Sequence, residues 1–288
     1  MVSTTSEKRD IMGIRIVADS SSDLLLWNGV DYASVPLRII TDAKEYTDNE
    51  ALDVSSMVQE LLNYKGRSST SCPNVADWLD AFSGAEEVLC FTITSNLSGA
   101  YASAVEAKKE YEQANPTAKV YVVDSLSVGG ETRLLMEKAV ELLGEGKTFE
   151  AICAEIEEYK KTTHLIFSLE SMKNLVNNGR VDRLSALAAG LLGIRAVGQA
   201  SDVGTLEMLK KARGKKQALQ TIFELVQERG FRGGKLRIAH CENEETAQEL
   251  ATMVQKRYPT ADIKIRPCGG LCSFYAERGG LILGFEGH

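Results

Sequence analysis

Short apolar segments alternate with amphipathic segments along the first 160 residues of the chain. The segments at 14–18, 87–93 and 119–124 have the apolar, β-branched character of buried strands, and helical periodicity follows at 98–113 and 131–143. Strands that alternate with helices pair in parallel, and the helices then cover both faces of the sheet. The pattern therefore restricts the chain to an α/β fold.

The remaining elements extend this pattern into two α/β domains. We predict an N-terminal domain at 13–161, with a Rossmann-like parallel sheet and helices on both its faces, and a C-terminal domain at 162–288 with a mixed sheet. A ligand cleft is expected between the domains, and residues 1–12 are expected to form a disordered extension. Further strands are predicted at 35–40, 164–169, 194–197, 205–209, 235–240, 262–266 and 281–285, and further helices at 53–64, 75–82, 149–159, 171–176, 184–192, 217–228 and 244–258.

Composition narrows the classes of partner. The net charge of −7 disfavours long-range attraction to nucleic acid or to an anionic membrane surface. No apolar run is long enough to cross a bilayer, and residues 1–12 lack the apolar core of a signal peptide. We therefore expect a cytoplasmic protein that binds no nucleic acid and touches a membrane at most transiently.

The six cysteines form no Cys-x-x-Cys pair, and without an export signal a disulfide framework is not expected. Cys268 and Cys272 are the one close pair. No second cysteine or histidine cluster completes a set of four ligands with them. We therefore predict free, mostly buried thiols and no metal at this pair.

Two hydroxyl-rich turns carry most of the functional information. They lie at 70–74 and 94–101, and the second stands between an apolar strand and a helix. An uncharged cluster of O–H and N–H donors at a strand end can hold a small anionic group without a lysine or arginine. Ser98 is predicted as the N-cap of the following helix, so backbone N–H groups of its first turn would face the same ligand.

Several enzyme signatures are incomplete. The string at 144–148 ends like a phosphate-binding loop, but Glu141 stands where that loop needs its first glycine. The chain has no Gly-x-Ser-x-Gly motif whose serine a histidine could activate as a nucleophile. It also has no Gly-x-Gly-x-x-Gly turn that could bind a dinucleotide. Asp19, Asp23 and Asp124 could bind Mg²⁺ at the strand ends, although aspartates in such turns more commonly cap helices.

Six segments in order resemble one known family, the DegV family, over residues 14–285. They are ADSSSDL at 18–24, VPL at 35–37, TSCPN at 70–74, ITSNLSGAYASA at 93–104, VVDSLSVGGE at 122–131 and NNGRVDRL at 177–184. The resemblance implies a two-domain α/β protein that buries one long-chain fatty acid between its domains. In bacteria such proteins are the acyl-carrying subunit of a fatty acid kinase that serves phospholipid synthesis, and a separate ATP-binding subunit makes the acyl phosphate.

The resemblance also assigns residues. By position, Thr70, Ser71, Ser95, Ser98 and Gly99 match the carboxylate-binding hydroxyls and loop of the family. The residues expected to support them or to substitute as donors are Asp19, Ser20, Asp124, Arg180, Cys272 and Ser273, and those expected to dock the kinase subunit are Lys211 and Arg213.

One segment departs from the family. Its His-Thr-Gly-Pro-Gly motif is absent from the corresponding stretch at 267–280, where Cys272, Ser273 or Tyr275 could act as the donor and Arg278 could add charge.

The sequence therefore predicts a fatty-acid carrier without catalytic residues, cofactor or metal. The apolar stretches at 165–167 and 184–194 could form the walls of its tunnel, although such stretches are more often plain core. An alternative is an enzyme that acts on a small carboxylated or phosphorylated substrate with Asp19, Asp124 and Cys272 in the cleft. A third hypothesis is a phosphate-responsive regulator that uses the same turns without a lipid. A long apolar tunnel would favour the carrier, whereas a short, wet pocket would favour the enzyme.

Overall fold

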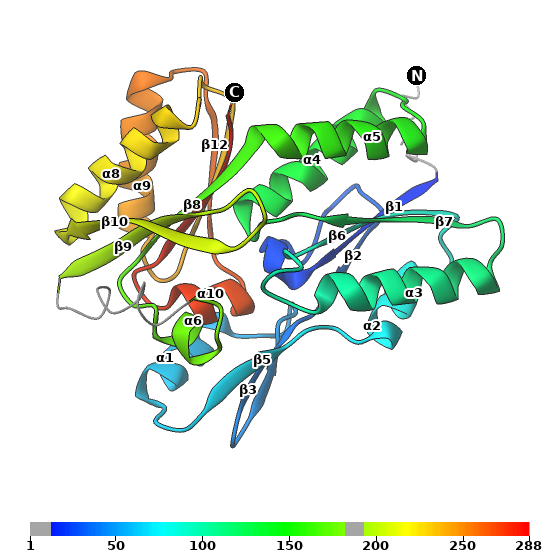
Figure 1. Cartoon of the computed structure of the whole chain (residues 1–288), viewed down its shortest axis with the longest axis horizontal. Coiled ribbons are helices and arrows are strands. Elements are labelled where there is room, and N and C mark those ends of the chain that lie inside the picture. Colours follow the sequence, from blue (N-terminus) through cyan, green and yellow to red (C-terminus); the bar gives the residue numbers. More distant parts are fainter. Residues whose placement is uncertain (1–12, 182–192, 288) are drawn as a thin grey trace, which may run out of the picture.

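A parallel sheet forms the first layer of the computed structural model, which describes residues 13–181 and 193–287 (Figure 1). Its strand order is β2-β1-β6-β7, and every pair is parallel. The strands are β1 (Ile14–Asp19), β2 (Tyr32–Val35), β6 (Glu87–Thr92) and β7 (Lys119–Asp124). This confirms the predicted Rossmann-like sheet in the N-terminal part.

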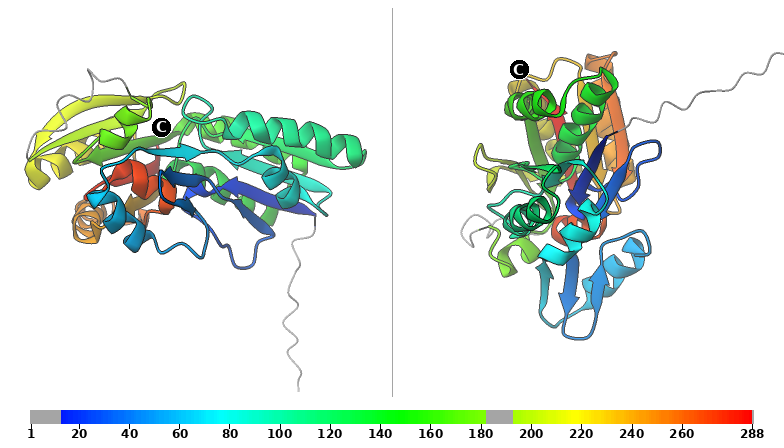
Figure 2. Two further views of the ribbon diagram at one scale, coloured as in Figure 1. Left: turned by 90° about the horizontal axis from the view of Figure 1, so that it is seen from below. Right: turned by 90° about the vertical axis from the view of Figure 1, so that its right-hand side faces the viewer.

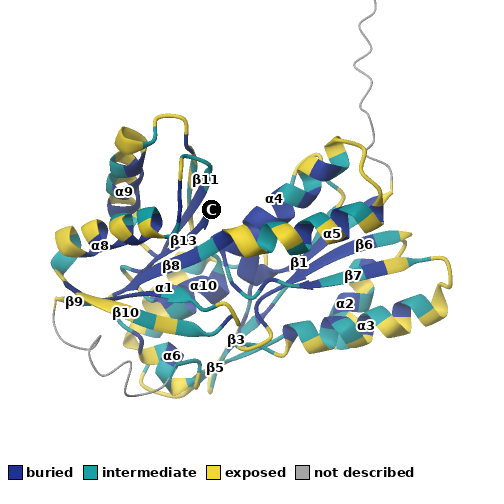
Figure 3. Ribbon diagram, turned by 45° about the horizontal axis from the view of Figure 1, so that its top comes forward, coloured by how far each residue is buried: buried dark blue, intermediate teal, exposed yellow. Residues whose placement is uncertain are grey.

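Helices cover both faces of this sheet because side chains along a strand alternate between the faces. Ile16 and Ala18 pack with α4 (Gly130–Gly144) and α5 (Phe149–Tyr159), whereas Val17 between them packs with helices on the opposite face. Those helices are α2 (Val75–Phe82) and α3 (Ala100–Ala114). Figure 3 shows the central strands β1 and β6 as mostly buried and the outward sides of α3 and α5 as exposed.

The second large sheet is mixed, as predicted, and has the order β10-β9-β8-β13-β11-β12. Only β11 and β12 pair in parallel among its described strands. The strands are β8 (Thr163–Leu169), β9 (Ile194–Ala200), β10 (Leu206–Arg213), β11 (Lys235–His240), β12 (Asp262–Pro267) and β13 (Leu281–Glu286). Helices α8 (Gly214–Glu228) and α9 (Glu244–Arg257) cover one face of this sheet.

A small antiparallel sheet projects away from both large sheets (Figure 2). It contains β3 (Arg38–Thr41), β4 (Glu45–Thr47) and β5 (Ser68–Ser71), and α1 (Val54–Asn63) connects its last two strands. The single strand predicted at 35–40 is therefore wrong. Pro36 has no N–H to donate to a strand ladder, and the chain leaves the parallel sheet there and enters the small sheet.

Two other elements differ from the sequence predictions. The antiparallel hairpin around 201–204 is confirmed, but β10 continues to Arg213, beyond the strand predicted at 205–209. The helix α10 (Gly270–Ala276) was not predicted, and the short α6 (Lys173–Asn177) replaces the helix expected at 171–176. The apolar helix predicted at 184–192 lies outside the described residues.

Helix α4 packs against both large sheets. The guanidinium of Arg237 on β11 donates to the Glu137 carboxylate of α4 at 2.6 Å, and Gly130 lies so close to β13 that a Cβ there would sit 2.8 Å from the Gly284 nitrogen. Short 3₁₀ turns at Ser20–Ser22 and Lys160–Thr162 complete the described elements. The domain limits at 13–161 and 162–288 stay a prediction.

Candidate functional site

A cavity of about 250 Å³ lies between the parallel sheet, the mixed sheet, β5 and α10. It is lined mainly by apolar side chains from segments far apart in the sequence. The lining residues are Leu37, Thr70, Ser71, Cys72, Ile93, Leu97, Ser98, Gly99, Val128, Leu165, Phe167, Leu169, Leu175, Arg180, Leu206, Leu271, Cys272, Tyr275, Ala276 and Ile282.

One wall of the cavity is entirely apolar. Leu165, Phe167 and Leu169 are alternate residues of β8, so the two-residue period of a strand turns all three to the same face. Ile282 on the neighbouring β13 extends this wall, because it pairs directly with Phe167. The prediction that 165–167 forms a tunnel wall agrees with the place of Leu165 and Phe167 in the cavity, whereas most of the second predicted stretch, 184–194, lies outside the described residues.

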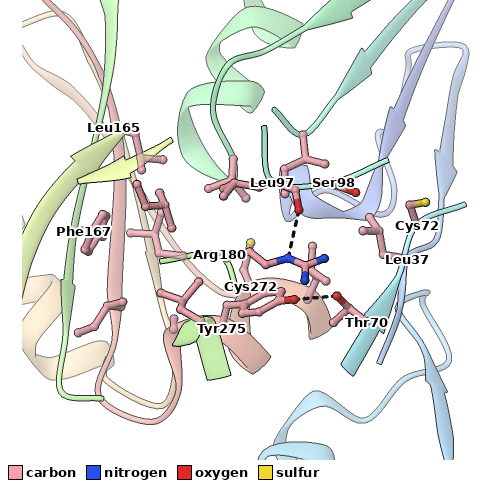
Figure 4. Close-up of a pocket in the computed structure, with 18 of the residues that line it drawn as sticks. Leu37, Thr70, Cys72, Leu97, Ser98, Leu165, Phe167, Arg180, Cys272 and Tyr275 are labelled. Atoms are coloured by element: carbon pink, nitrogen blue, oxygen red, sulfur yellow. Dashed lines mark hydrogen bonds between the residues drawn. The ribbon is translucent and has the colours of Figure 1, made fainter. Parts of the chain in front are cut away.

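The opposite side of the cavity carries the hydroxyl groups, as Figure 4 shows for Thr70 and Ser98. The Thr70 Oγ1 atom lies 2.7 Å from the Tyr275 hydroxyl oxygen. Ser98 is not the N-cap of α3, because the helix begins at Ala100 and Gly99 is the capping residue. The Ser98 hydroxyl still accepts a hydrogen bond from the Ala100 N–H at 3.2 Å.

Arg180 brings a positive charge to the cavity. Its Nε–H donates to the carbonyl oxygen of Leu97 at 3.2 Å, and its Nη1 donates to the carbonyl oxygen of Asn178. The guanidinium is therefore held by backbone carbonyls beside the loop that carries Ser98. Arg180 therefore lines the cavity next to the hydroxyl groups, and its supporting role stays a prediction.

Ser95 lies elsewhere, although it was predicted beside Ser98. Its side chain is exposed and does not line the cavity, and its backbone N–H donates to Asp124 Oδ1 at 3.1 Å. Asp124 accepts a second bond from the Leu126 N–H at 3.1 Å. Both residues therefore shape the loops next to the cavity, and the geometry gives neither a direct contact with a ligand there.

Asp19 and Ser20 bind the backbone of residues that line the cavity. Asp19 accepts from the Ile93 N–H at 2.8 Å, and Ser20 Oγ accepts from the Leu37 N–H at 3.1 Å. Burial raises the pKa of Asp19 from 3.8 to about 6. These two side chains position Ile93 and Leu37, which do line the cavity.

Of the substitute donors in the altered segment, only Cys272 and Tyr275 reach the cavity lining. The Cys272 thiol donates to the Ser21 carbonyl oxygen at 3.4 Å, and the buried Ser273 hydroxyl donates to the Cys268 carbonyl oxygen at 3.3 Å. Burial also raises the pKa of the Cys268 and Cys272 thiols well above 9.0. The enzyme hypothesis needed Asp19, Asp124 and Cys272 together in the cleft, and only Cys272 lines the cavity.

Sequence reasoning missed the way α10 is held. The carboxylate of the buried Asp48 accepts from the N–H groups of Gly270 and Leu271 at 2.7 and 2.9 Å, and Asp23 accepts from the Gly269 N–H at 2.8 Å. Asp48 is more than 200 residues away in the chain from these partners. No local pattern signals a contact over such a separation.

The predicted docking residues lie outside the cavity. Lys211 and Arg213 are exposed on β10, which is an edge strand of the mixed sheet. Among the described residues, no group of three His, Cys, Asp or Glu side chains is arranged to hold a metal ion. In the same ranges, none of the helices combines the length and apolar character that crossing a membrane requires.

The fold and the cavity define a class: an α/β protein with a parallel and a mixed large sheet, and with an internal cavity that is apolar on one side and hydroxyl-rich on the other. The family model for an uncharacterised protein of the DegV family matches residues 13–286. A DegV domain-containing protein of Streptococcus pneumoniae is 41% identical over 276 residues, which cover 94% of this chain and 98% of that protein. The chain belongs to the DegV family, and the resemblance noted in the sequence is confirmed.

Two solved structures are closely similar. A DegV family protein from Eubacterium eligens, loaded with heptadecanoic acid, has a TM-score of 0.94 and 44% identity, covering 96% of this chain and 100% of that chain. The Streptococcus pneumoniae fatty acid kinase (Fak) B3 protein, loaded with linoleic acid, has a TM-score of 0.93 and 41% identity, covering 96% of this chain and 99% of that chain. These similarities confirm the predicted α/β fold, with a parallel sheet in the N-terminal part and a mixed sheet in the C-terminal part.

Proposed function

We propose that this protein binds one long-chain fatty acid in the cavity, with the carboxylate beside Thr70, Ser71, Ser98 and Gly99. The acyl chain lies along the apolar wall that β8 provides. The observation that carries the proposal is the distribution of polarity, since hydroxyl groups gather on one side of a cavity whose other side is apolar. Relatives loaded with heptadecanoic acid and with linoleic acid support it.

Burial of the acyl chain supplies most of the binding free energy. About fourteen methylenes at ~0.8 kcal/mol each give ~11 kcal/mol before the costs of ordering are subtracted. Hydrogen bonds from hydroxyl or amide groups to a charged oxygen add ~1.5–3 kcal/mol each. A few neutral donors are therefore sufficient for the carboxylate.

The same neutral donors suit a carrier that presents its ligand for phosphorylation. A carboxylate held mainly by hydroxyl groups stays nucleophilic, whereas a tight arginine clamp would stabilise it in the ground state. Arg180 lies beside these hydroxyl groups, but its Nε–H and Nη1 already donate to the carbonyl oxygens of Leu97 and Asn178. The proposed partner is the ATP-binding subunit of a fatty acid kinase. The exposed Lys211 and Arg213 on β10 are the proposed docking residues, and the similarity to a fatty acid kinase (Fak) B3 protein supports this role.

The proposal places the protein in the bacterial cytoplasm. There it would carry acyl groups toward phospholipid synthesis and touch the membrane only transiently. The chain itself would supply no catalytic residue and need no cofactor, because the kinase subunit brings ATP. The division into domains at 13–161 and 162–288 is part of the same proposal, with the fatty acid between them.

Native mass spectrometry of the purified protein, followed by organic extraction, tests whether the protein binds a fatty acid. We expect one fatty acid per chain, and delipidated protein should take up heptadecanoic acid with the same stoichiometry. A protein that is purified empty and takes up no added fatty acid would refute the proposal. In that case the small-substrate enzyme would become the leading hypothesis.

Charge reversal on β10 tests whether Lys211 and Arg213 dock the ATP-binding subunit. The Lys211→Glu, Arg213→Glu variant should bind the ATP-binding subunit more weakly and yield less acyl phosphate, while its fatty acid content stays unchanged. Lys256→Glu with Arg257→Glu is the matched control, because these exposed residues lie at the end of α9. An equal loss in both variants would indicate a general effect of net charge, and docking through β10 would be rejected.

A further inference from the structure

The hydroxyl groups of Thr70 and Tyr275 meet at the polar side of the cavity. They come from β5 and from α10, 205 residues apart in the chain, and their oxygen atoms are 2.7 Å apart (Figure 4). The Tyr275 ring packs edge-on against Phe274, with ring centroids 4.9 Å apart. Burial raises the pKa of Tyr275, so the phenol is protonated throughout the neutral pH range.

The pair of Thr70 and Tyr275 has one hydroxyl proton available for a ligand. Two hydroxyl groups carry two protons, and the bond between them uses one. Within the described residues, neither hydroxyl donates to any other acceptor. Because both residues line the cavity, one O–H donor of the pair remains for a ligand in it.

The other candidate donors of the altered segment are already engaged. The Cys272 thiol donates to the Ser21 carbonyl oxygen, and the Ser273 hydroxyl donates to the Cys268 carbonyl oxygen. Of Cys272, Ser273 and Tyr275, therefore, only Tyr275 joins the hydroxyl group of Thr70.

We infer that Tyr275 is a positioning residue: its phenol donates to Thr70 Oγ1 and so turns the Thr70 hydroxyl proton toward a fatty acid carboxylate. This inference rests on the proposed function. A phenol is a stronger acid than an aliphatic alcohol and is the better donor of the two, which favours donation from Tyr275 to Thr70. The bond also restricts rotation of the Thr70 hydroxyl and polarises it, and such chains of hydrogen bonds strengthen one another.

Dissociation constants for heptadecanoic acid and for its methyl ester test the inference in the wild type, Tyr275→Phe, Thr70→Val and the double variant. We expect Tyr275→Phe to weaken binding of the acid roughly three- to tenfold, as the loss of one net hydrogen bond does. Binding of the ester, which lacks the charged acceptor, should change less than twofold. In the Thr70→Val background, Tyr275→Phe should have no further effect on the acid.

Tyr111→Phe is the matched control. Its hydroxyl is also bonded, to the Ala85 carbonyl oxygen at 2.8 Å, but Tyr111 does not line the cavity. This variant should bind the acid and the ester like the wild type. Thermal unfolding of each variant checks that the protein stays folded after the loss of a tyrosine hydroxyl, and we expect a cooperative transition for each.

Three results would overturn the inference alone: unchanged acid binding in Tyr275→Phe, an equal loss for the acid and the ester, or effects of Tyr275→Phe and Thr70→Val that simply add. The second of these would mean that Tyr275 serves only to pack α10. A wild-type protein that binds neither ligand would overturn the proposed function, and this inference with it.

Discussion

The hydroxyl groups of Thr70 and Ser98 give the most direct test of how the carboxylate is held. We consider the double variant Thr70→Val, Ser98→Ala, which removes both hydroxyl groups and keeps side chains of similar or smaller size. Both residues line the cavity. The Ser98 oxygen accepts from the Ala100 N–H at 3.2 Å, and its own proton has no acceptor among the described residues.

The expected loss follows from the number of donors. Each hydroxyl can donate one hydrogen bond to a carboxylate oxygen, and such a bond to a charged group is worth ~1.5–3 kcal/mol. Two of them are worth ~3–6 kcal/mol, which weakens the affinity for the acid by about 10² to 10⁴. The apolar wall of β8 is untouched, so the contribution of the acyl chain should stay the same.

Competition with a fluorescent fatty acid measures this loss for heptadecanoic acid and for its methyl ester. The ester shares the acyl chain but carries no charge, so its affinity should fall far less than that of the acid. Thr70→Ser with Ser98→Thr is the control, because both hydroxyl groups are kept. Equal losses for acid and ester, or a loss for the acid below about threefold, would refute the assignment of the carboxylate site.

Three further predictions concern stability. Burial raises the pKa of Glu131 from 4.5 to about 7, so the folded protein keeps a proton that the unfolded chain releases, and the free energy of unfolding falls as pH rises through this range. In urea titrations of Glu131→Gln, the free energy of unfolding should fall by ~2–3 kcal/mol less between pH 5 and pH 8 than it does in the wild type. The same fall in both proteins would contradict this. Asp48→Ala should cost ~3 kcal/mol in urea titrations, because two amide N–H groups of α10 lose a carboxylate that lies 2.7 and 2.9 Å away; a cost below ~1 kcal/mol would contradict this. Gly198→Ala should lower the thermal unfolding temperature and cost ~1–3 kcal/mol, since its Cβ would lie 2.3 Å from both the Glu207 carbonyl oxygen and the Phe167 ring; an unchanged midpoint would contradict this.

The sequence by itself determined the features that depend on neighbouring residues. Alternation of apolar strands with helices predicted the parallel sheet, and the hydroxyl-rich turns predicted Thr70 and Ser98, which line the cavity. The apolar character of a strand is a local property, so the sequence could indicate the stretch 165–167, of which Leu165 and Phe167 line the cavity. The order and spacing of the six motifs were sufficient to indicate the DegV family.

Only the tertiary structure decided which distant residues meet. Pro36 divides one predicted strand between two sheets, and Ser95 turns outward although it stands three residues before Ser98. The contact of Thr70 with Tyr275 joins segments 205 residues apart. Such contacts arise when elements far apart in the sequence, here the strand β5 and the helix α10, pack together, and no periodicity within either segment indicates them.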